Sequence, residues 1–381
     1  MHKKPTKNRF IAASSRCSTK SLSSLLVLCF GKLLQSRRNY CQTIFNSTGV
    51  NSMWIIDNNS KFIDGLRKLS NNNKASSLTV HDFSTLYTNI DLSDLKEKLT
   101  LFVTQIFEKS SNYLVVNTAT SNVKWNNVIP KYTINKSNYH CITKDILISH
   151  LTFLIDNIYV KFGDKLFQQV VGIPMGTNCA PLFANIYLHC YEFDYINKLR
   201  IIDNKMARRF SNTYRYIDDL ASVNNPLFND VISDIYPKSL TVNKENISSL
   251  SANYLDVSIT VSNKKFITKI YDKRDDFKFN VNSLPHASSK INLHSASHVY
   301  IGQLLRPAYT CTELIDFHKQ NNIIVTKLMK NGFTKKKLII ILKKFLSSHA
   351  DVLKKWNYQN SQFALYKKYA FNEEFRGDMN V

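Results

Sequence analysis

Two adjacent aspartates, Asp218 and Asp219, are the residues of this 381-residue chain that are best suited to carry chemistry. They stand between apolar residues in the segment Arg215–Val223, whose two halves predict short strands joined by a tight turn. Neighbouring carboxylates repel each other when both are ionised, so a divalent cation would stabilise such a turn. Mg²⁺ fits this role because it takes oxygen ligands and leaves positions open for substrate phosphates. For an isolated pair, a solvated Asp-Asp turn would be the simpler interpretation.

Two segments further upstream favour the metal site over that simpler interpretation. The apolar pattern of residues 78–83 predicts a short buried strand, with Asp82 near its carboxyl end. The segment Gly172–Pro181 predicts a loop in which glycine permits close backbone approach, and an apolar helix follows over Leu182–Leu188. An Asp at a strand end, a Gly-rich loop before a helix, and an Asp-Asp hairpin follow one another in the order of a polymerase palm.

These three segments resemble motifs A, B and C of reverse transcriptases, with Tyr216–Asp219 as the motif C box. The sequence is most similar to the reverse transcriptases of Penelope-like retroelements, a branch related to the catalytic subunit of telomerase. The resembling stretches are spread over most of the chain: Lys7–Ser15, Trp54–Asn58, Asp82–Ile90, Gly172–Glu192, Tyr214–Asn224, Tyr254–Asp256 and Tyr300–Arg306. The resemblance implies an α+β right-hand polymerase, with partial fingers over residues 1–77, a palm with an antiparallel sheet and motifs A to D over 78–275, and a helical thumb over 276–381.

The resemblance also implies a nucleotidyltransferase that copies RNA into DNA by adding dNTPs to a primer 3′-hydroxyl. Two Mg²⁺ ions, with Mn²⁺ as an alternative, would serve the attacking and leaving oxygens. Asp82 and Asp218 are expected to hold both ions. Asp219 is expected to be the third acidic residue near the primer end, and the carbonyl of Phe83 to be a further ligand.

Several residues are expected to contact the nucleotide. Tyr87 matches the steric gate that excludes a 2′-hydroxyl, although from sequence alone a core tyrosine would be the simpler interpretation. Arg9 resembles the fingers residue that grips the triphosphate. Lys273 matches a proton donor to pyrophosphate, but an ordinary surface lysine is the favoured interpretation. The loop residues expected against the nascent base pair are Gly172, Pro174, Met175 and Gly176.

The composition agrees with a polyanionic partner, since the formal net charge is +23. Residues 1–56 contain nine Lys or Arg and no acidic residue, and residues 327–368 contain eleven lysines and one acidic residue, Asp351. We therefore expect an RNA template and a DNA primer or RNA–DNA hybrid as partners. A solubilising basic face is the alternative.

The chain contains seven cysteines at irregular spacing and no Cys-x-x-Cys, which favours reduced thiols in an intracellular protein. No apolar run approaches the roughly 20 residues that span a bilayer, so no membrane partner is expected. The basic amino end resembles a mitochondrial transit peptide in composition. Cleavage would remove Arg9–Ile11, which match a fingers motif, so a nuclear location is favoured over a mitochondrial one.

Two other functions are alternatives to reverse transcription. An RNA-dependent RNA polymerase is disfavoured because such enzymes usually carry Gly before the Asp pair and a polar residue where Tyr87 stands. A catalytically degenerate or domesticated RNA-binding retroelement fragment is the main alternative, because the upstream fingers strand is not evident. No GIY-YIG nuclease is expected, since Tyr300–Gly302 has no partner Gly-Ile-Tyr at suitable spacing.

Overall fold

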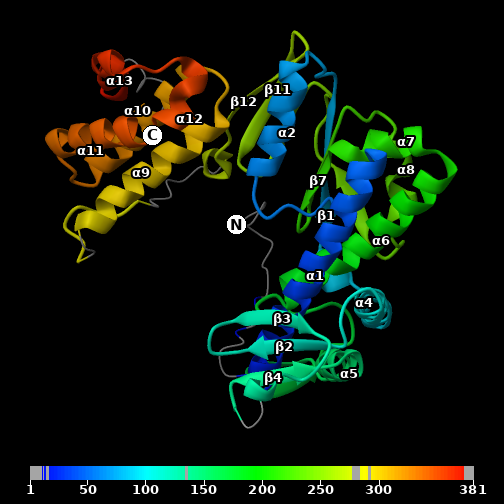
Figure 1. Ribbon diagram of the computed structural model, residues 1–381. Helices are drawn as coiled ribbons and strands as arrows, with labels where there is room; N and C mark the ends of the chain where they lie inside the picture. The colour runs from blue at the N-terminus through cyan, green and yellow to red at the C-terminus, as the bar shows by residue number, and fades with distance from the viewer. Residues whose placement is uncertain are drawn as a thin grey trace. The chain divides into compact units, whose positions relative to one another are not determined.

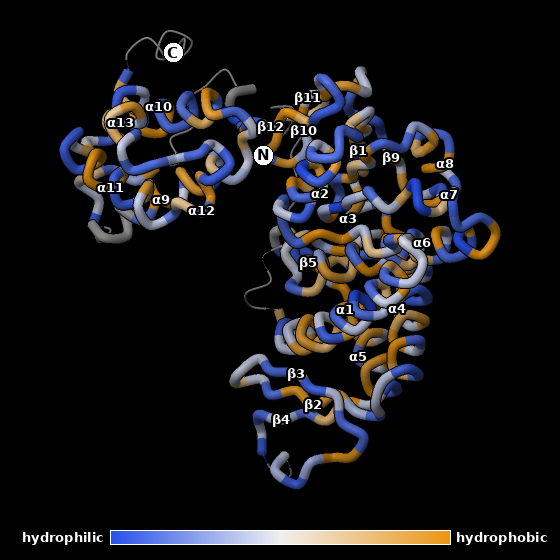
Figure 2. The backbone as a smooth tube through the Cα atoms, turned by 45° about the horizontal axis from the view of Figure 1, so that its top comes forward, coloured by the Kyte–Doolittle hydropathy of each residue, from blue (hydrophilic) through white to orange (hydrophobic). Residues whose placement is uncertain are grey.

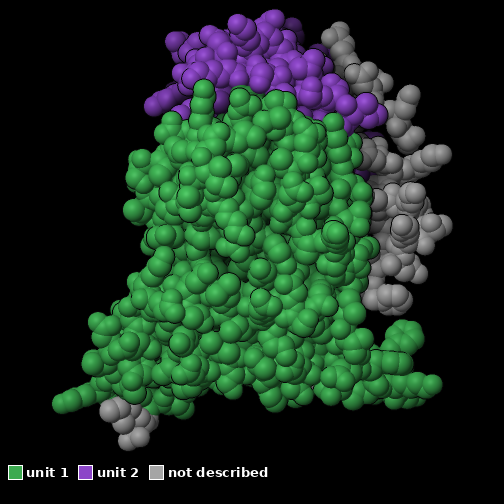
Figure 3. All heavy atoms as spheres, turned by 90° about the vertical axis from the view of Figure 1, so that its right-hand side faces the viewer, with its two compact units in different colours: residues 1–58, 79–245 green, residues 59–78, 246–381 purple. Residues whose placement is uncertain are grey.

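The computed structural model describes residues 11, 13, 17–133, 136–276, 284–290 and 293–372. The chain forms two compact units, one from residues 1–58 and 79–245 and the other from residues 59–78 and 246–381 (Figure 3). This division into two units does not test the expected division into fingers, palm and thumb, which stays a prediction.

The helices of the first unit surround a large apolar core. Within it α1, α4, α5 and α6 pack against one another. Gly49, in the left-handed conformation with φ 72°, ends α1 by donating its N–H to the carbonyl of Phe45 at 2.8 Å. The helices are α1 (Lys20–Thr48), α3 (Leu86–Asn89), α4 (Leu92–Phe107), α5 (Lys144–Asp156), α6 (Ala180–Ile202), α7 (Asn204–Arg208) and α8 (Phe228–Ile235), with 3₁₀ turns η1 (Lys131–Thr133) and η2 (Arg209–Asn212) (Figure 1).

A four-stranded sheet in the order β7-β8-β1-β9 brings together segments that are far apart in the sequence. Its strands are β1 (Leu78–Ser84), β7 (Thr213–Tyr216), β8 (Asp219–Val223) and β9 (Thr241–Lys244). The pairs β7–β8 and β1–β9 are antiparallel, as expected for a palm sheet. The central strands are almost entirely buried, so this sheet belongs to the core of the unit.

The segment between α4 and α6 carries five further strands. A three-stranded sheet in the order β3-β2-β4 contacts α1 through β2 and β3, and a separate hairpin pairs β5 with β6. The strands are β2 (Tyr113–Asn117), β3 (Asn122–Asn126), β4 (Tyr139–Ile142), β5 (Tyr159–Phe162) and β6 (Lys165–Gln168). The apolar runs on either side of Gly163–Lys165 predict a hairpin, and the β5–β6 hairpin leads into the loop that begins at Gly172.

The second unit combines a three-stranded sheet, in the order β10-β11-β12, with helices around their own apolar core. In it α2 packs on β12, and Phe62 meets Tyr254 edge-on at 4.7 Å. Figure 2 shows apolar and polar residues alternating along the helices of both units. The elements are α2 (Ser60–Asn71), β10 (Ser251–Tyr254), β11 (Val257–Ser262), β12 (Lys265–Ile270), η3 (Lys273–Asp276), α9 (Leu293–Thr310), α10 (Leu314–Lys330), α11 (Lys335–Ser348), α12 (Ala350–Leu353), η4 (Lys354–Trp356), η5 (Asn360–Gln362) and α13 (Phe363–Ala370).

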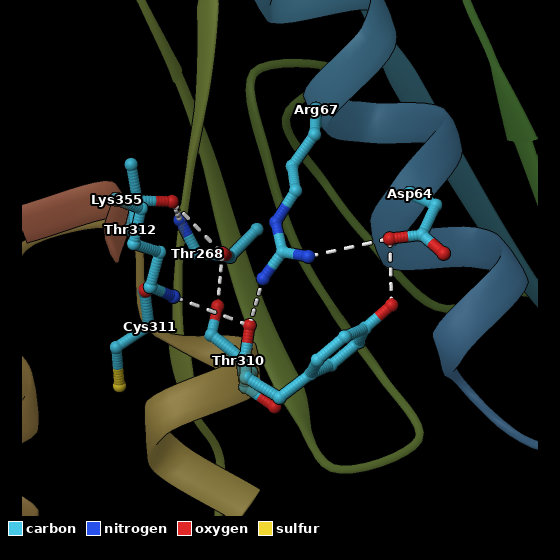
Figure 4. A network of polar contacts seen from close by, with 8 residues as sticks. Asp64, Arg67, Thr268, Thr310, Cys311, Thr312 and Lys355 are labelled. Atoms are coloured by element: carbon cyan, nitrogen blue, oxygen red, sulfur yellow. Dashed lines mark hydrogen bonds and ion pairs between the residues drawn. The ribbon is translucent and has the colours of Figure 1, made fainter. Parts of the chain in front are cut away.

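The carboxyl end of α9 is held by side chains from three other parts of the second unit (Figure 4). The carbonyl of Tyr309 accepts from Arg67 of α2 and from Lys355, and the carbonyl of Thr310 accepts from the hydroxyl of Thr268 at 2.5 Å. These donors satisfy carbonyl groups that a helix end leaves without intrahelical partners.

No helix in the described part of the chain is long and apolar enough to cross a membrane, and all seven cysteines are free thiols.

This network predicts the effect of removing one buried hydroxyl. Thr268→Val should lower the free energy of unfolding by about 1–3 kcal/mol, because the carbonyl of Thr310 loses its donor in a buried position. Urea denaturation followed by circular dichroism measures the change. Thr260→Val, at an exposed position of the neighbouring strand β11, is the matched control and should stay within about 0.5 kcal/mol of wild type. Equal changes in the free energy of unfolding for both substitutions would show that the bond from Thr268 to the carbonyl of Thr310 does not stabilise the fold.

Candidate active site

The two segments that carry the aspartates lie side by side in the four-stranded sheet. The N–H of Phe83 donates to the carbonyl of Asp218 at 3.2 Å, and the hydroxyl of Thr79 donates to the carbonyl of Ser222 at 3.5 Å. Residue numbers rise along β1 as they fall along β8, so the strands are antiparallel. In that register Asp82 lies directly opposite Asp219, and such cross-strand neighbours have Cβ atoms roughly 5 Å apart.

The alternation of side chains along β1 turns Asp82 away from the apolar core. Phe83 is buried and meets Tyr236 edge-on at 4.8 Å, whereas Asp82 is half-buried. Asp218 and Asp219 are half-buried as well. The pairing of β1 with the hairpin therefore brings the three aspartate residues onto adjacent strands, and none of the three is fully buried.

The turn that presents Asp218 is strained. Tyr216 pairs with Asp219 across the β7–β8 hairpin, which leaves Ile217 and Asp218 as the two turn residues. Ile217 has φ 54°, at the first central position, where hairpin turns favour glycine. For a β-branched residue this left-handed conformation costs about 1–2 kcal/mol. The surroundings of the turn must hold this conformation, since Ile217 does not prefer it.

The Gly172 loop is bonded directly to the turn that follows β1. The N–H of Gly172 donates to the carbonyl of Ile90 at 2.8 Å, and the N–H of Ile173 donates to the carbonyl of Tyr87 at 2.7 Å. Gly172 has φ +77°, and a Cβ placed on it would lie 2.4 Å from the carbonyl oxygen of Tyr87 and 2.7 Å from the Cα of Thr88. Only glycine allows this approach, so the loop and the turn behave as one structural element.

Tyr87, the expected steric gate, is half-buried in α3 and shares this neighbourhood. Burial and, to a smaller extent, the carboxylate of Asp218 raise the pKa of Tyr87 to about 12. The phenol is therefore close enough to sense the charge of Asp218, and it stays protonated at neutral pH. This position fits the expected contact with a nucleotide sugar, and the role itself stays a prediction.

The other expected residues are distributed as follows. Pro174 and Met175 are half-buried in the loop before α6, and Gly176 is exposed with φ +119°. Lys273 lies in the second unit, exposed in η3. Arg9 lies outside the described residues. The nucleotide contacts expected of these five residues stay predictions.

The donor set suits a hard divalent cation. Among the residues that the structure describes, no three His, Cys, Asp or Glu side chains are grouped closely enough to hold a metal ion by themselves. Mg²⁺ does not need such a group, because it is usually held by one or two carboxylates together with substrate phosphates and water. Asp82 and the facing Asp218–Asp219 pair supply carboxylates of this kind, and the carbonyl of Phe83 stays a predicted further ligand.

Sequence analysis missed Arg215, a fully buried side chain next to the Asp-Asp turn. Its Nη1 donates to the carbonyl of Ile217 at 3.0 Å, and its Nε donates to Glu192 of α6 at 2.5 Å. Glu192 lies at the helical spacing of the buried Leu188 and Ile196, and this acidic residue on an apolar face was the signal that could have revealed a buried charge.

Comparisons with known proteins point to a polymerase fold of the reverse-transcriptase type. No model of a protein family matches the chain. Over 95 residues the chain is 28% identical to the telomerase reverse transcriptase of Tetrahymena thermophila, a match that covers 24% of this chain and 8% of that protein.

The fold resembles that of solved telomerases. Telomerase from Candida albicans, in complex with a TWJ fragment of telomeric RNA, superimposes with a TM-score of 0.55 at 13% identity, over 94% of this chain and 58% of that chain. Apo telomerase from Candida tropicalis gives a TM-score of 0.46 at 14% identity, over 91% and 55% of the two chains. The chain thus spans little more than half of these telomerases. The expected α+β polymerase fold is confirmed, while the Penelope-like assignment stays a prediction.

The close approach at Gly172 yields a test with an internal control. Gly172→Ala should lower the free energy of unfolding by about 2–5 kcal/mol, because it combines an unfavourable backbone conformation with a clash against fixed backbone atoms. Gly163→Ala in the β5–β6 turn shares the positive φ, +59°, but has no atom within 4 Å of the added Cβ, so it should cost only about 1–2 kcal/mol. If urea denaturation showed equal decreases in the free energy of unfolding for the two variants, the contact between Gly172 and Tyr87 would not be tight.

Proposed function

We propose that the chain is an RNA-directed DNA polymerase that extends a primer 3′-hydroxyl with dNTPs. The observation that carries this proposal is the pairing of β1 with the β7–β8 hairpin, which sets Asp82 opposite Asp219 and beside Asp218. The similarity to a telomerase reverse transcriptase in sequence, and to a telomerase in fold, supports the same reaction.

Each residue of the site has its own proposed role. Mg²⁺ held by Asp82 and Asp218 would lower the pKa of the primer hydroxyl and neutralise charge on the triphosphate. Asp219 lies beside them and would orient the primer end. Tyr87 would stack under the sugar, and the Gly172 loop, bonded to the Tyr87 turn, would support the nascent base pair.

The distribution of lysines supports a nucleic-acid partner. Three lysines, Lys335, Lys336 and Lys337, occupy the first turn of α11, where the helix macrodipole already disfavours positive charge. A polyanion would offset that cost. In the other unit, the β5–β6 hairpin exposes Phe162 and Phe167, which could stack on bases. We propose an RNA template and a DNA primer or RNA–DNA hybrid, and the Candida albicans telomerase was solved with an RNA fragment.

The biological setting belongs to the same proposal. The motifs that resemble Penelope-like reverse transcriptases suggest a retroelement protein that acts in the nucleus. A degenerate or domesticated fragment that binds RNA without catalysis is the alternative, and the experiment below separates the two.

Primer extension tests the proposed activity. Purified protein should incorporate dNTPs on an RNA template in the presence of Mg²⁺, and Asp218→Ala should lower kcat about a thousandfold, because it removes a carboxylate expected to hold the metal. Asp234→Ala, an exposed position of α8, should leave kcat unchanged. Incorporation of NTPs alone would refute reverse transcription. Template binding without any incorporation would favour the degenerate fragment.

Tyr87 provides a test of sugar selection. Tyr87→Ala should reduce the preference for dNTPs over NTPs by roughly 10- to 200-fold, because it opens space for a 2′-hydroxyl. Tyr87→Phe keeps the ring and should retain the preference. The measurement is the ratio of kcat/KM for dATP and ATP, and the same ratio for both variants would contradict the assigned role.

A further inference from the structure

A fully buried ion pair joins α6 to the Asp-Asp hairpin. Arg215 of β7 and Glu192 of α6 both have exposed fractions of 0%, and two bonds connect them: Nε to Oε1 at 2.5 Å and Nη2 to Oε2 at 3.2 Å. Desolvation makes such a pair a poor source of stability, and apolar residues of similar volume often do as well or better. The pair therefore suggests a role in placing neighbouring groups.

The bonds of Arg215 use the complete donor capacity of its guanidinium group. Nη1 donates to the side-chain oxygen of Asn185 at 2.8 Å and to the carbonyl of Ile217 at 3.0 Å, and Nη2 also donates to the carbonyl of Asn185 at 2.9 Å. Together with the two bonds to Glu192, these contacts account for all five N–H groups. A lysine at this position carries the same charge but cannot bind all of these acceptors in one plane.

Glu192 is in turn held by a residue that also touches β1. The hydroxyl of Tyr236 donates to Oε1 of Glu192 at 2.8 Å, and burial, followed by the charge of Glu192, raises the pKa of Tyr236 well above its ordinary value. The phenol therefore stays a donor. The ring of Tyr236 meets Phe83, the residue after Asp82. One network thus contacts both segments that carry the aspartates.

The acceptor at the turn is the carbonyl of Ile217, the group directly before Asp218. Ile217 is held in the left-handed conformation that it does not prefer. We propose that Arg215 is a positioning residue: by holding the carbonyl of Ile217 against α6, it sets the direction in which Asp218 presents its carboxylate. This inference rests on the proposed polymerase activity and adds a residue that would tune it.

The test uses Arg215→Lys in the 381-residue chain. We expect kcat for primer extension to fall roughly 10- to 100-fold and the Mg²⁺ concentration for half-maximal rate to rise, while the Kd for template–primer stays unchanged. Ile217→Gly in the Arg215→Lys background should restore most of the lost kcat, because glycine adopts a positive φ without strain. Should Arg215→Lys not fold, Glu192→Gln carries the same test with the same expected rescue.

Arg37→Lys is the matched control. Arg37 is also buried in the first unit, donates to Gln105 at 2.5 Å and packs over the rings of Phe102 and Phe193, all of which lie on helices outside the hairpin. Its substitution should affect stability but not the Mg²⁺ dependence. Equal kcat losses in both arginine variants, or no rescue by Ile217→Gly, would overturn the positioning role. A wild-type protein without activity would instead refute the proposed function.

Discussion

The hydrogen bond from the N–H of Phe83 to the carbonyl of Asp218 is the contact on which the whole site depends. It fixes the register between β1 and the β7–β8 hairpin. A slip of one residue would turn Asp82 into the core and Phe83 toward solvent, because side chains alternate between the faces of a strand. The packing of Phe83 on Tyr236 makes that slip unfavourable, so the apolar core determines where the carboxylate lies.

Helix α6 links the other parts of the site to this register. Its amino end continues the Gly172 loop, which is bonded to the Tyr87 turn, and its middle carries Glu192, which holds Arg215. Loop, turn and hairpin are thus connected through backbone hydrogen bonds and one buried ion pair. Backbone hydrogen bonds and a buried ion pair fix the positions of residues more closely than surface contacts do. A site that needs several carboxylates close together requires such support.

Much of this arrangement could be predicted from the sequence because it depends on local patterns. The helical spacing of the apolar residues over Leu92–Phe107 predicts a helix, and α4 has these bounds. The apolar residues around Asp82 predicted β1. The apolar residues over 22–34 also predict a helix, and in the structure α1 continues to Thr48, since no Gly or Pro occurs between Gly31 and Gly49. The β2–β3–β4 sheet was missed because its strands are only four or five residues long, too short for a clear periodic pattern. The pairing of Arg215 with Glu192 was also missed, because the burial of each residue leaves a local signal but no local pattern tells which residues pair across 23 positions.

The central claim is that Asp82 and Asp218 present their carboxylates to the same metal ion. The most direct measurement is anomalous diffraction from crystals of the protein bound to template–primer, an unreactive dNTP analogue and Mn²⁺. We expect a Mn²⁺ peak about 2.0–2.2 Å from a carboxylate oxygen of each of the two residues. Mn²⁺ bound to nucleotide phosphates with neither Asp82 nor Asp218 within coordination distance would contradict it.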